Sequence, residues 1–189
     1  MKKSFFNVIP DQSHTFSKAY HQYPRKFAPR YVTNANGCTL HTDLGSFTDW
    51  SMGLGPVIKG YNFQELNDHI SLKINNGIAY SLPSEYEFNI ARKLLNVLNF
   101  GEQVRFAKNG SDVTSAAIRL SRYQTGKEKI ICNGYHGWQD WYISKTSMNG
   151  GIPDEISKYS HRFNYNDIQI LENLLKKFKN QVACIILEP

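Results

Sequence analysis

Two stretches in the first half of the chain repeat apolar residues at the spacing of an α-helix. In the first, Asn62 with Glu65 forms a cap-like start, Gly77 provides a stop, and the apolar face comprises Phe63, Leu66, Ile70 and Ile74. In the second, Ser84 and Glu87 form a capping box, and helical spacing continues with Phe88, Ala91, Leu95 and Leu98. The pattern therefore predicts two amphipathic helices in this part of the chain.

Two further helices are predicted in the second half. One begins at Ser111 or Asp112 and runs to about Gln124, with an expected inward face of Ala116, Ala117 and Leu120. The other covers roughly residues 167–179, and its apolar stripe comprises Leu171, Leu174, Leu175 and Phe178.

Short apolar runs lie between these helices, at residues 104–107, 129–132 and 182–187. Runs of this length that alternate with helices are typical of buried strands in an α/β sheet. The second half of the chain is therefore expected to form such a sheet.

The first sixty residues have a different pattern. Residues 1–30 contain three prolines among mixed polar and aromatic residues, which predicts an extended arm. Strand-like residues 30–33 and 39–43 then flank the sequence Asn34-Ala35-Asn36-Gly37. Asn-Gly between two such runs predicts a hairpin turn.

The composition is that of an ordinary globular protein. Of the 189 residues, 41% are apolar and 20% are charged, enough for one domain or for one domain and part of another. No apolar run approaches the roughly 18 residues of a membrane span. The apolar stretch near the start is too short for a signal peptide, so we expect a cytoplasmic protein without a membrane partner.

Charge and cysteine content narrow the functional classes further. The net charge is +6, but Lys and Arg are spread along the chain, and the densest group falls at a predicted helix end, where cations complement the helix dipole. No nucleic-acid partner is therefore expected. Cys132 and Cys184 lie in apolar runs that indicate buried, reduced thiols. Neither Cys-x-x-Cys nor His-x-x-x-His occurs, so no metal site is expected.

Residues 105–114 contain the most informative pattern. A strand-like run ends, Gly110 permits a tight turn, and a helix begins with the hydroxyl residue Ser111. Free backbone N–H groups and the positive end of a helix bind phosphate, with Gly110 allowing close approach and Ser111 adding a hydroxyl hydrogen bond. The alternative is that Ser111 only caps the helix. Asp112 suits the helix dipole but repels a phosphate unless its side chain points away, so the residues leave both interpretations open.

Two other segments place polar or aromatic residues directly after predicted strands. Tyr135 and His136 lie in a glycine-flanked loop after the 129–132 run, and loops at the carboxyl ends of strands are where α/β proteins bind ligands. A tyrosine there can stack on a flat ring, and a histidine can exchange protons. Glu188 likewise follows the last apolar run. The alternatives are aromatic packing within the loop and an acid that only marks the end of the core.

Taken in order, these motifs resemble those of the class III aminotransferases, in the branch near glutamate-1-semialdehyde aminomutase. That family has a loop of the Asn-Ser-Gly-Thr-Glu-Ala type, then Ala-Ile-Arg-Leu-Ala-Arg, Tyr-Thr-Gly, a Lys-Ile strand and Tyr-His-Gly. This chain has, in the same order, residues 109–114, Ala117-Ile118-Arg119-Leu120-Ser121-Arg122, Gln124-Thr125-Gly126, Lys129-Ile130-Ile131 and Tyr135-His136-Gly137. Upstream, residues 55–62 and 83–85 resemble the family's Gly-Pro-x-Ile-x-Gly-His and Pro-Thr-Glu. The similarity covers about residue 30 to the end.

The resemblance implies an α/β fold, the PLP-dependent transferase fold type I (aspartate aminotransferase-like), with pyridoxal 5'-phosphate (PLP) as the cofactor. It implies an N-terminal arm at 1–30, the N-terminal part of the small domain at 31–78, and the first half of the PLP-binding large domain at 79–189. Its implied site residues are Gly110 and Ser111 at the cofactor phosphate, Tyr135 stacked on the pyridine ring, His136 beside it, and Glu188 near the substrate.

The implied activity is transamination between a small-molecule amino donor and a carbonyl acceptor, by a homodimer. In the family, the Schiff-base lysine and the aspartate that pairs with the pyridine nitrogen follow the Glu-Pro motif. We therefore expect part of a longer enzyme in which this chain holds no catalytic lysine.

Two departures bear on which family member this is. The aminomutase has Ser-Trp-Gly-Pro and Tyr-His-Gly-His where this chain has Gly53-Leu54-Gly55-Pro56 and Tyr135-His136-Gly137-Trp138. The departures favour a related transaminase. The alternatives are the aminomutase proper and a non-catalytic module that binds a phosphate ligand.

Overall fold

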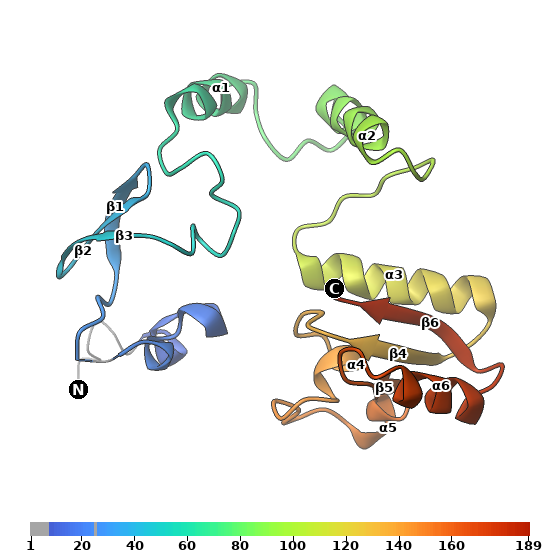
Figure 1. The fold of residues 1–189 in the computed structure, drawn as a ribbon. Helices are drawn as coiled ribbons and strands as arrows, with labels where there is room; N and C mark the ends of the chain where they lie inside the picture. Colours follow the sequence, from blue (N-terminus) through green and yellow to red (C-terminus); the bar gives the residue numbers. More distant parts are fainter. Residues whose placement is uncertain (1–7, 25) are drawn as a thin grey trace. The chain divides into compact units, whose positions relative to one another are not determined.

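The computed structural model describes residues 8–24 and 26–189. The chain divides between Pro83 and Ser84 into two compact units, each with a sheet of its own. Both units can be followed in Figure 1 by their colours, blue to green for the first and green to red for the second.

The sheet of the first unit is an antiparallel meander of β1 (Val32–Asn36), β2 (Thr39–Thr42) and β3 (Gly45–Thr48). The predicted hairpin is confirmed, but its turn is shorter than expected. Because Asn36 pairs with Thr39, only Gly37 and Cys38 form the turn. A two-residue turn needs positive φ, and Gly37 has φ +56°. The third strand was not predicted, since its four residues are all exposed and carry no core pattern.

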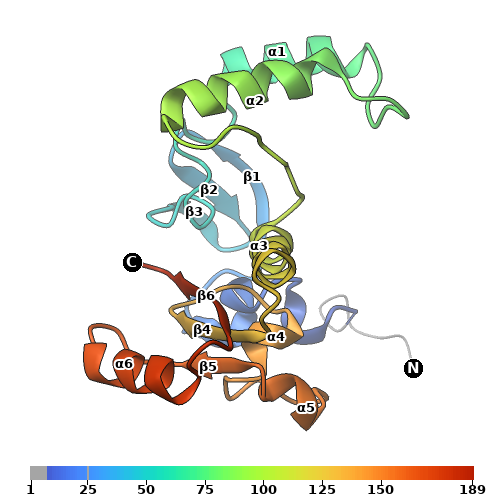
Figure 2. The same ribbon diagram turned by 90° about the vertical axis from the view of Figure 1, so that its right-hand side faces the viewer.

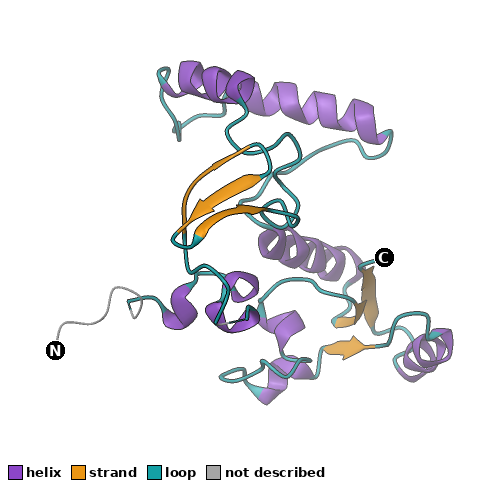
Figure 3. Cartoon of the chain, turned by 60° about the vertical axis from the view of Figure 1, so that its left-hand side comes forward, coloured by secondary structure: helices purple, strands orange, loops and turns teal. Residues whose placement is uncertain are grey.

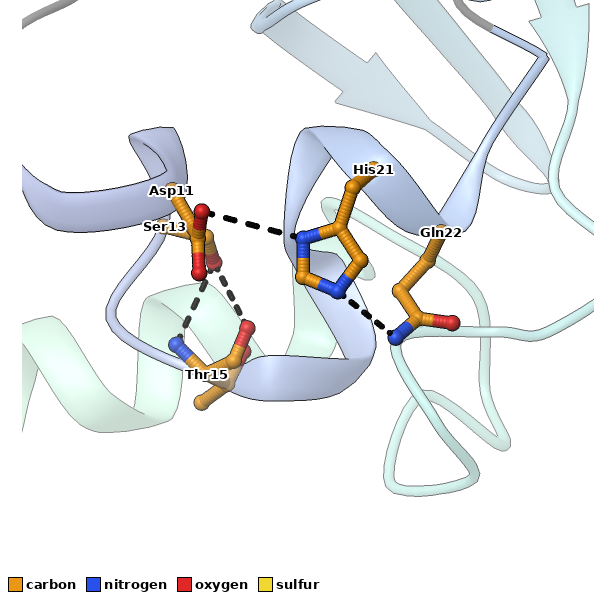
Figure 4. A network of polar contacts seen from close by, with 5 residues as sticks. All are labelled: Asp11, Ser13, Thr15, His21 and Gln22. Atoms are coloured by element: carbon orange, nitrogen blue, oxygen red, sulfur yellow. Dashed lines mark hydrogen bonds and ion pairs between the residues drawn. The ribbon is translucent and has the colours of Figure 1, made fainter. Parts of the chain in front are cut away.

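The described residues before the hairpin include short 3-10 turns instead of the extended arm that the sequence suggests for residues 1–30, of which residues 1–7 and 25 lie outside the described part. The turns are η2 (Pro10–Gln12), η3 (Phe16–Lys18) and η4 (Tyr20–Gln22). Figure 4 shows the polar contacts that connect them: Asp11 lies 3.8 Å from His21 Nδ1, and His21 Nε2 lies 3.1 Å from the Gln22 amide nitrogen, while Ser13 bonds the backbone of Thr15. Ala19, the residue between η3 and η4, is buried.

Helix α1 (Gln64–Ile74) is the helix predicted after residue 62, but its cap differs from the prediction. Phe63 occupies the N-cap position without a side-chain hydrogen bond. Asn62 has φ +54° and accepts a hydrogen bond from Asn67 Nδ2 at 2.7 Å, so it is one residue too early to cap the helix. The predicted stop is sound, because α1 ends three residues before Gly77, which has φ +92°.

The second unit contains a parallel sheet in the order β5-β4-β6. Its strands are β4 (Lys129–Asn133), β5 (Ser160–Arg162) and β6 (Val182–Leu187). The predicted strands at 129–132 and 182–187 are confirmed. The predicted strand at 104–107 is wrong, because those residues pair with no strand within the described part of the chain. Strand β5 was missed because Ser-His-Arg has no apolar pattern.

The two faces of the parallel sheet carry different helices (Figures 1 and 2). Ile130 and Cys132 are buried on one face, where they form a core cluster with Ile118 of α3 (Gly110–Thr125) and two aromatic residues of α4 (Asp140–Ile143). On the other face His161 of β5 stacks on Phe178, which follows α6 (Ile168–Lys177), with ring centroids 4.1 Å apart. The short helix α5 (Asp154–Ser157) precedes β5.

Helix α3 was predicted correctly in extent but not in orientation. The expected inward residues Ala116, Ala117 and Leu120 are exposed, whereas Ser111 and Ile118 are buried. Residues seven apart lie on one helical face, so the buried face is the one that begins with Ser111. The small side chain of Ser111 lets the start of the helix lie close to Gly137 in the loop after β4.

Helices α2 and α6 begin with side-chain caps. Helix α2 (Glu85–Leu98) begins with the predicted capping box, in which Ser84 accepts from Tyr86 N and donates its own N–H to Glu87. Helix α6 is capped by Asp167, the first residue of the predicted helix, which accepts from Ile170 N at 3.0 Å. The apolar face predicted for α2 is present but unburied, since no residue of α2 is buried.

Within the described residues, no helix combines the length and the apolar content that crossing a membrane requires. No group of three His, Cys, Asp or Glu side chains in the same residues could hold a metal ion.

Candidate functional site

Three segments of the second unit meet at the carboxyl edge of the parallel sheet. They are the first turn of α3, the loop 134–138 that follows β4, and Glu188 at the end of β6. Figure 3 shows α3 running alongside the strands of this unit. This edge is where open α/β sheets bind ligands, and it brings all five residues singled out in the sequence into one region.

The first turn of α3 carries backbone N–H groups that remain available. Asn109 is the N-cap residue, and its side chain accepts from Asp112 N at 3.0 Å. The alternative that Ser111 caps this helix is therefore wrong. Among the described residues, no acceptor faces the N–H groups of Gly110 and Ser111. Such groups at a helix start attract an anion.

Gly110 plays a different part from the expected tight turn. It lies within the helix, and its φ is not positive. A Cβ built on Gly110 meets no atom within 4 Å. The backbone here is thus open to a ligand that approaches the exposed N–H groups.

Ser111 is fixed by the neighbouring loop. It is only 8% exposed, and its Oγ accepts from Trp138 N at 3.3 Å. Because the hydroxyl serves as the acceptor in that bond, its own proton remains available for donation. Gly137, with φ +106°, passes so close that a Cβ there would lie 2.9 Å from Ser111 Cβ and would clash with Oγ.

Thr114, one turn further along α3, ties the helix to the loop. Its hydroxyl lies 2.9 Å from the His136 carbonyl oxygen and 3.2 Å from that of Ser111. No pattern in the sequence indicates this role, since a threonine inside a helix identifies no partner 22 residues away. The contact places the loop that carries Tyr135 directly beside the open turn of α3.

Tyr135 and Glu188 are joined through the backbone. Tyr135 N donates to Glu188 Oε2 at 2.8 Å, and Glu188 N donates to the Asn133 carbonyl at 3.1 Å. Gly134, with φ +89°, leaves no room for a side chain, because a Cβ there would lie 2.9 Å from Glu188 Oε2. The Tyr135 ring itself is 65% exposed, so its side chain can contact a ligand.

His136 is buried and held by hydrogen bonding. It is 7% exposed, and its Nε2 lies 2.7 Å from the carbonyl oxygen of Asn133. Because a carbonyl oxygen only accepts, Nε2 carries the proton in this arrangement. The ring packs against Trp141 and Tyr142 at centroid distances of 5.9 and 5.4 Å. Proton exchange through Nε2 would therefore require breaking this bond, and the geometry favours a role in holding the loop.

Neighbouring ionisable groups are kept neutral by burial. Burial raises the pKa of the Cys132 thiol to about 11, so this cysteine is an inert core residue at neutral pH. Burial likewise raises the pKa of Tyr142, whose hydroxyl donates to the Gly134 carbonyl at 2.8 Å. The site therefore combines a helix start with two backbone N–H groups that have no acceptor among the described residues, an exposed aromatic ring and one carboxylate. This combination fits a flat aromatic ligand that carries an anionic group.

Sequence comparison places the chain among known enzymes. The model of the aminotransferase class-III family matches residues 20–189. The chain is 31% identical over 195 residues to the glutamate-1-semialdehyde 2,1-aminomutase of Francisella philomiragia, and 32% identical over 183 residues to the 3-aminobutyryl-CoA aminotransferase of Cloacimonas acidaminovorans. Each alignment covers 96% of this chain and 44% of the relative, so the chain spans less than half the length of these relatives.

Solved structures give the same result for the fold. The chain superimposes on an omega-transaminase from Sphaerobacter thermophilus with a TM-score of 0.84 at 22% identity, covering 96% of this chain and 44% of that one. It superimposes equally well, at 27% identity, on the FumI protein of a Sphingopyxis species solved with PLP, covering 94% and 42%. The α/β fold is therefore that of the PLP-dependent transaminases, and this chain belongs to the class III aminotransferase family.

Proposed function

We propose that the intact protein is a PLP-dependent transaminase and that this chain supplies the surface that holds the phosphate and one face of the cofactor ring. The observation that carries the proposal is the juxtaposition of the open first turn of α3 with the exposed Tyr135 ring. Family membership and the PLP-bound relative indicate PLP as the cofactor.

The residues present fit this cofactor. The N–H groups of Gly110 and Ser111 and the Ser111 hydroxyl would bind the phosphate, since Gly110 leaves the approach open. Tyr135 would stack on the pyridine ring. When bound, PLP supplies the electron sink that amino-group transfer requires. The chain's own contribution is to bind and orient, which makes proton transfer efficient.

His136 and Glu188 have supporting roles in this proposal. His136 holds the loop through its bond to Asn133 and would lie beside the cofactor ring. Glu188 binds the backbone of Tyr135 and would lie near the substrate. No catalytic lysine is proposed in this chain. Lys129, at the amino end of β4, lies at the opposite edge of the sheet from Tyr135.

The wider assignment follows the family resemblance. We infer an N-terminal arm at residues 1–30, the N-terminal part of the small domain at 31–78, and the first half of the PLP-binding large domain at 79–189. The substrates would be a small-molecule amino donor and a carbonyl acceptor. The intact enzyme would be a cytoplasmic homodimer.

The aminomutase proper is the second candidate, because the chain is about as similar to an aminomutase as to an aminotransferase. Gly53-Leu54-Gly55-Pro56 and Trp138 favour the transaminase. An aminomutase moves the amino group within one substrate, whereas a transaminase requires a separate acceptor. Turnover of glutamate-1-semialdehyde without an added acceptor would identify the aminomutase.

The phosphate site is tested by Ser111→Ala in the intact protein. We expect the dissociation constant of PLP to rise by roughly 5- to 150-fold, since a bond to a charged group contributes about 1–3 kcal/mol. Ser121→Ala is the matched control, because its hydroxyl bonds within the same helix, to the Ala117 carbonyl, and should leave PLP affinity unchanged.

Equilibrium dialysis and visible absorbance measure both variants. Unchanged PLP affinity in Ser111→Ala would limit Ser111 to anchoring the loop. If the wild-type protein retained no PLP at all, the transaminase proposal would fail, and stoichiometric binding of another phosphate compound would point to the non-catalytic module.

A further inference from the structure

The loop 134–138 is fixed at its two glycines but needs further support between them. Gly134 and Gly137 lack room for any side chain because Glu188 and Ser111 press against them. The exposed ring of Tyr135 lies between these points. A tyrosine ring on the surface can adopt several rotamers unless a neighbour restricts it.

Tyr142 of α4 restricts the Tyr135 ring by packing against it. It is only 4% exposed, and its ring meets Tyr135 edge to face, at a centroid distance of 5.9 Å and an interplanar angle of 85°. Within the described residues, this is the one ring in contact with Tyr135. The same ring meets His136 at 5.4 Å and 90°.

The hydroxyl of Tyr142 adds a second contact, to the backbone of the loop. It donates to the Gly134 carbonyl at 2.8 Å, at the residue where the loop leaves β4. Burial raises the pKa of Tyr142, so the hydroxyl stays protonated and remains a donor at neutral pH. One side chain thus contacts the peptide before Tyr135, the Tyr135 ring and the residue after it.

We propose that Tyr142 is a positioning residue that sets the orientation of the Tyr135 ring, through its edge contact and its bond to Gly134. This inference rests on the proposed function, in which Tyr135 stacks on the cofactor. Stacking depends on the angle of the ring face, so a change beneath Tyr135 alters cofactor binding without touching the cofactor.

The variants Tyr142→Leu and Tyr142→Phe in the intact protein separate the two contacts. Leucine removes both, and we expect the PLP dissociation constant to rise about tenfold, the scale of a lost aromatic contact. Phenylalanine keeps the ring and loses only the hydroxyl, so we expect a rise of about threefold. The visible circular dichroism of bound PLP, which reports ring orientation, should fall in Tyr142→Leu and remain near wild type in Tyr142→Phe.

Tyr159→Leu is the matched control. Tyr159 is a partly exposed tyrosine whose ring contacts Arg122 and Lys129, at the opposite edge of the same sheet. Its loss should lower stability without changing the dichroism. Equal dichroism in Tyr142→Leu and wild type, or an equal change in Tyr159→Leu, would overturn the proposal.

A crystal structure of cofactor-free Tyr142→Leu separates this inference from the proposed function. We expect the Tyr135 ring to leave its wild-type rotamer or to become disordered, whether or not the protein is a transaminase. An unchanged, well-ordered Tyr135 would refute the positioning role. Wild-type protein that fails to bind PLP would refute the proposed function instead, and leave the rotamer result to decide the role of Tyr142.

Discussion

Gly134 and Gly137 at the site must be glycine for two reasons: both have positive φ, and neither has room for a side chain. Gly137 has φ +106°, a region that L side chains rarely adopt, and its missing Cβ lies against Ser111. The loop and the first turn of α3 can come together only because both conditions are met. A side chain at Gly137 would push the loop away from the proposed phosphate position.

Gly137→Ala is therefore expected to be strongly damaging. We predict a loss of about 2–4 kcal/mol in the free energy of unfolding, from backbone strain and overpacking together, and a loss of PLP retention. Urea unfolding and cofactor content measure the two effects. Gly150→Ala is the control, since Gly150 has no positive φ and its added Cβ meets no atom within 4 Å. If Gly137→Ala and Gly150→Ala lowered the free energy of unfolding equally, the close approach of Gly137 to Ser111 would contribute nothing to stability.

At the residue scale, the sequence predicted which residues lie together at the site, but not the neighbouring residues that hold them in position. Gly110, Ser111, Tyr135, His136 and Glu188 were all found from strand ends, a helix start and motif order. Their supports, Thr114, Asn109 and Tyr142, were not. Thr114 and Tyr142 act on a loop whose position depends on the tertiary fold, and the Asn109 cap becomes visible only once the helix start is known to be Gly110.

At the scale of elements, the apolar periodicity predicted the positions of most helices and strands, but not in every case which face of a helix is buried. The four long helices and two of the parallel strands are where the apolar patterns place them. Strand β5 could not be predicted, because three polar residues become a strand only through their register with Ile130, Ile131 and Cys132. The face of α3 was mispredicted because the buried side begins with a serine, whose burial depends on the loop after β4.

The packing of β5 against α6 predicts a pH dependence of stability. His161 lies between these elements, stacked on Phe178, and its Nε2 is buried without a hydrogen-bond partner. Burial, reinforced by the positive charges of Lys129, Lys145 and Lys177, lowers the pKa of His161 from 6.5 to about 4. Between pH 6.5 and about 4, His161 is therefore protonated in the unfolded chain and neutral in the folded protein. Stability from this group is complete above pH 6.5 and is lost as pH falls toward 4.

We expect this loss to be on the order of 1–2 kcal/mol, less than the full shift implies because solvent screens a partly exposed ring. His161→Phe keeps the stack and removes the titration, so its free energy of unfolding should change less between pH 6.5 and 4.5 than that of wild type. His69→Gln, on exposed α1, is the control. Urea unfolding measures the free energy of unfolding at each pH. Identical pH profiles for wild type and His161→Phe would show that the pKa of His161 is the same in the folded and unfolded states.

At the scale of the whole molecule, many large apolar side chains are exposed. Several of them lie on and after α2, where no residue of the helix is buried, and include Phe88, Ile90, Val97, Leu98 and Phe100, all at least 44% exposed. Phe88 and Leu98 belong to the apolar face that the amphipathic pattern predicted, whereas Ile90 and Val97 lie on the opposite side of the helix. Within the second unit, these side chains stay exposed. The chain spans 44% of the length of its relatives, which leaves most of their length available to cover them.

The 189-residue chain expressed by itself should therefore bind the apolar dye ANS and associate in solution, because large apolar side chains exposed close together drive association. Replacing Phe88 and Val97 by serine should lower dye fluorescence and shift the chain toward a monomer in sedimentation, whereas Lys93→Ser on the same helix should do neither. A protein extended to the length of the relatives should bind less dye than the 189-residue chain. If the 189-residue chain at tens of micromolar is instead a monomer that binds no dye, the apolar side chains of α2 are buried in solution. In that case α2 needs no further chain to cover it.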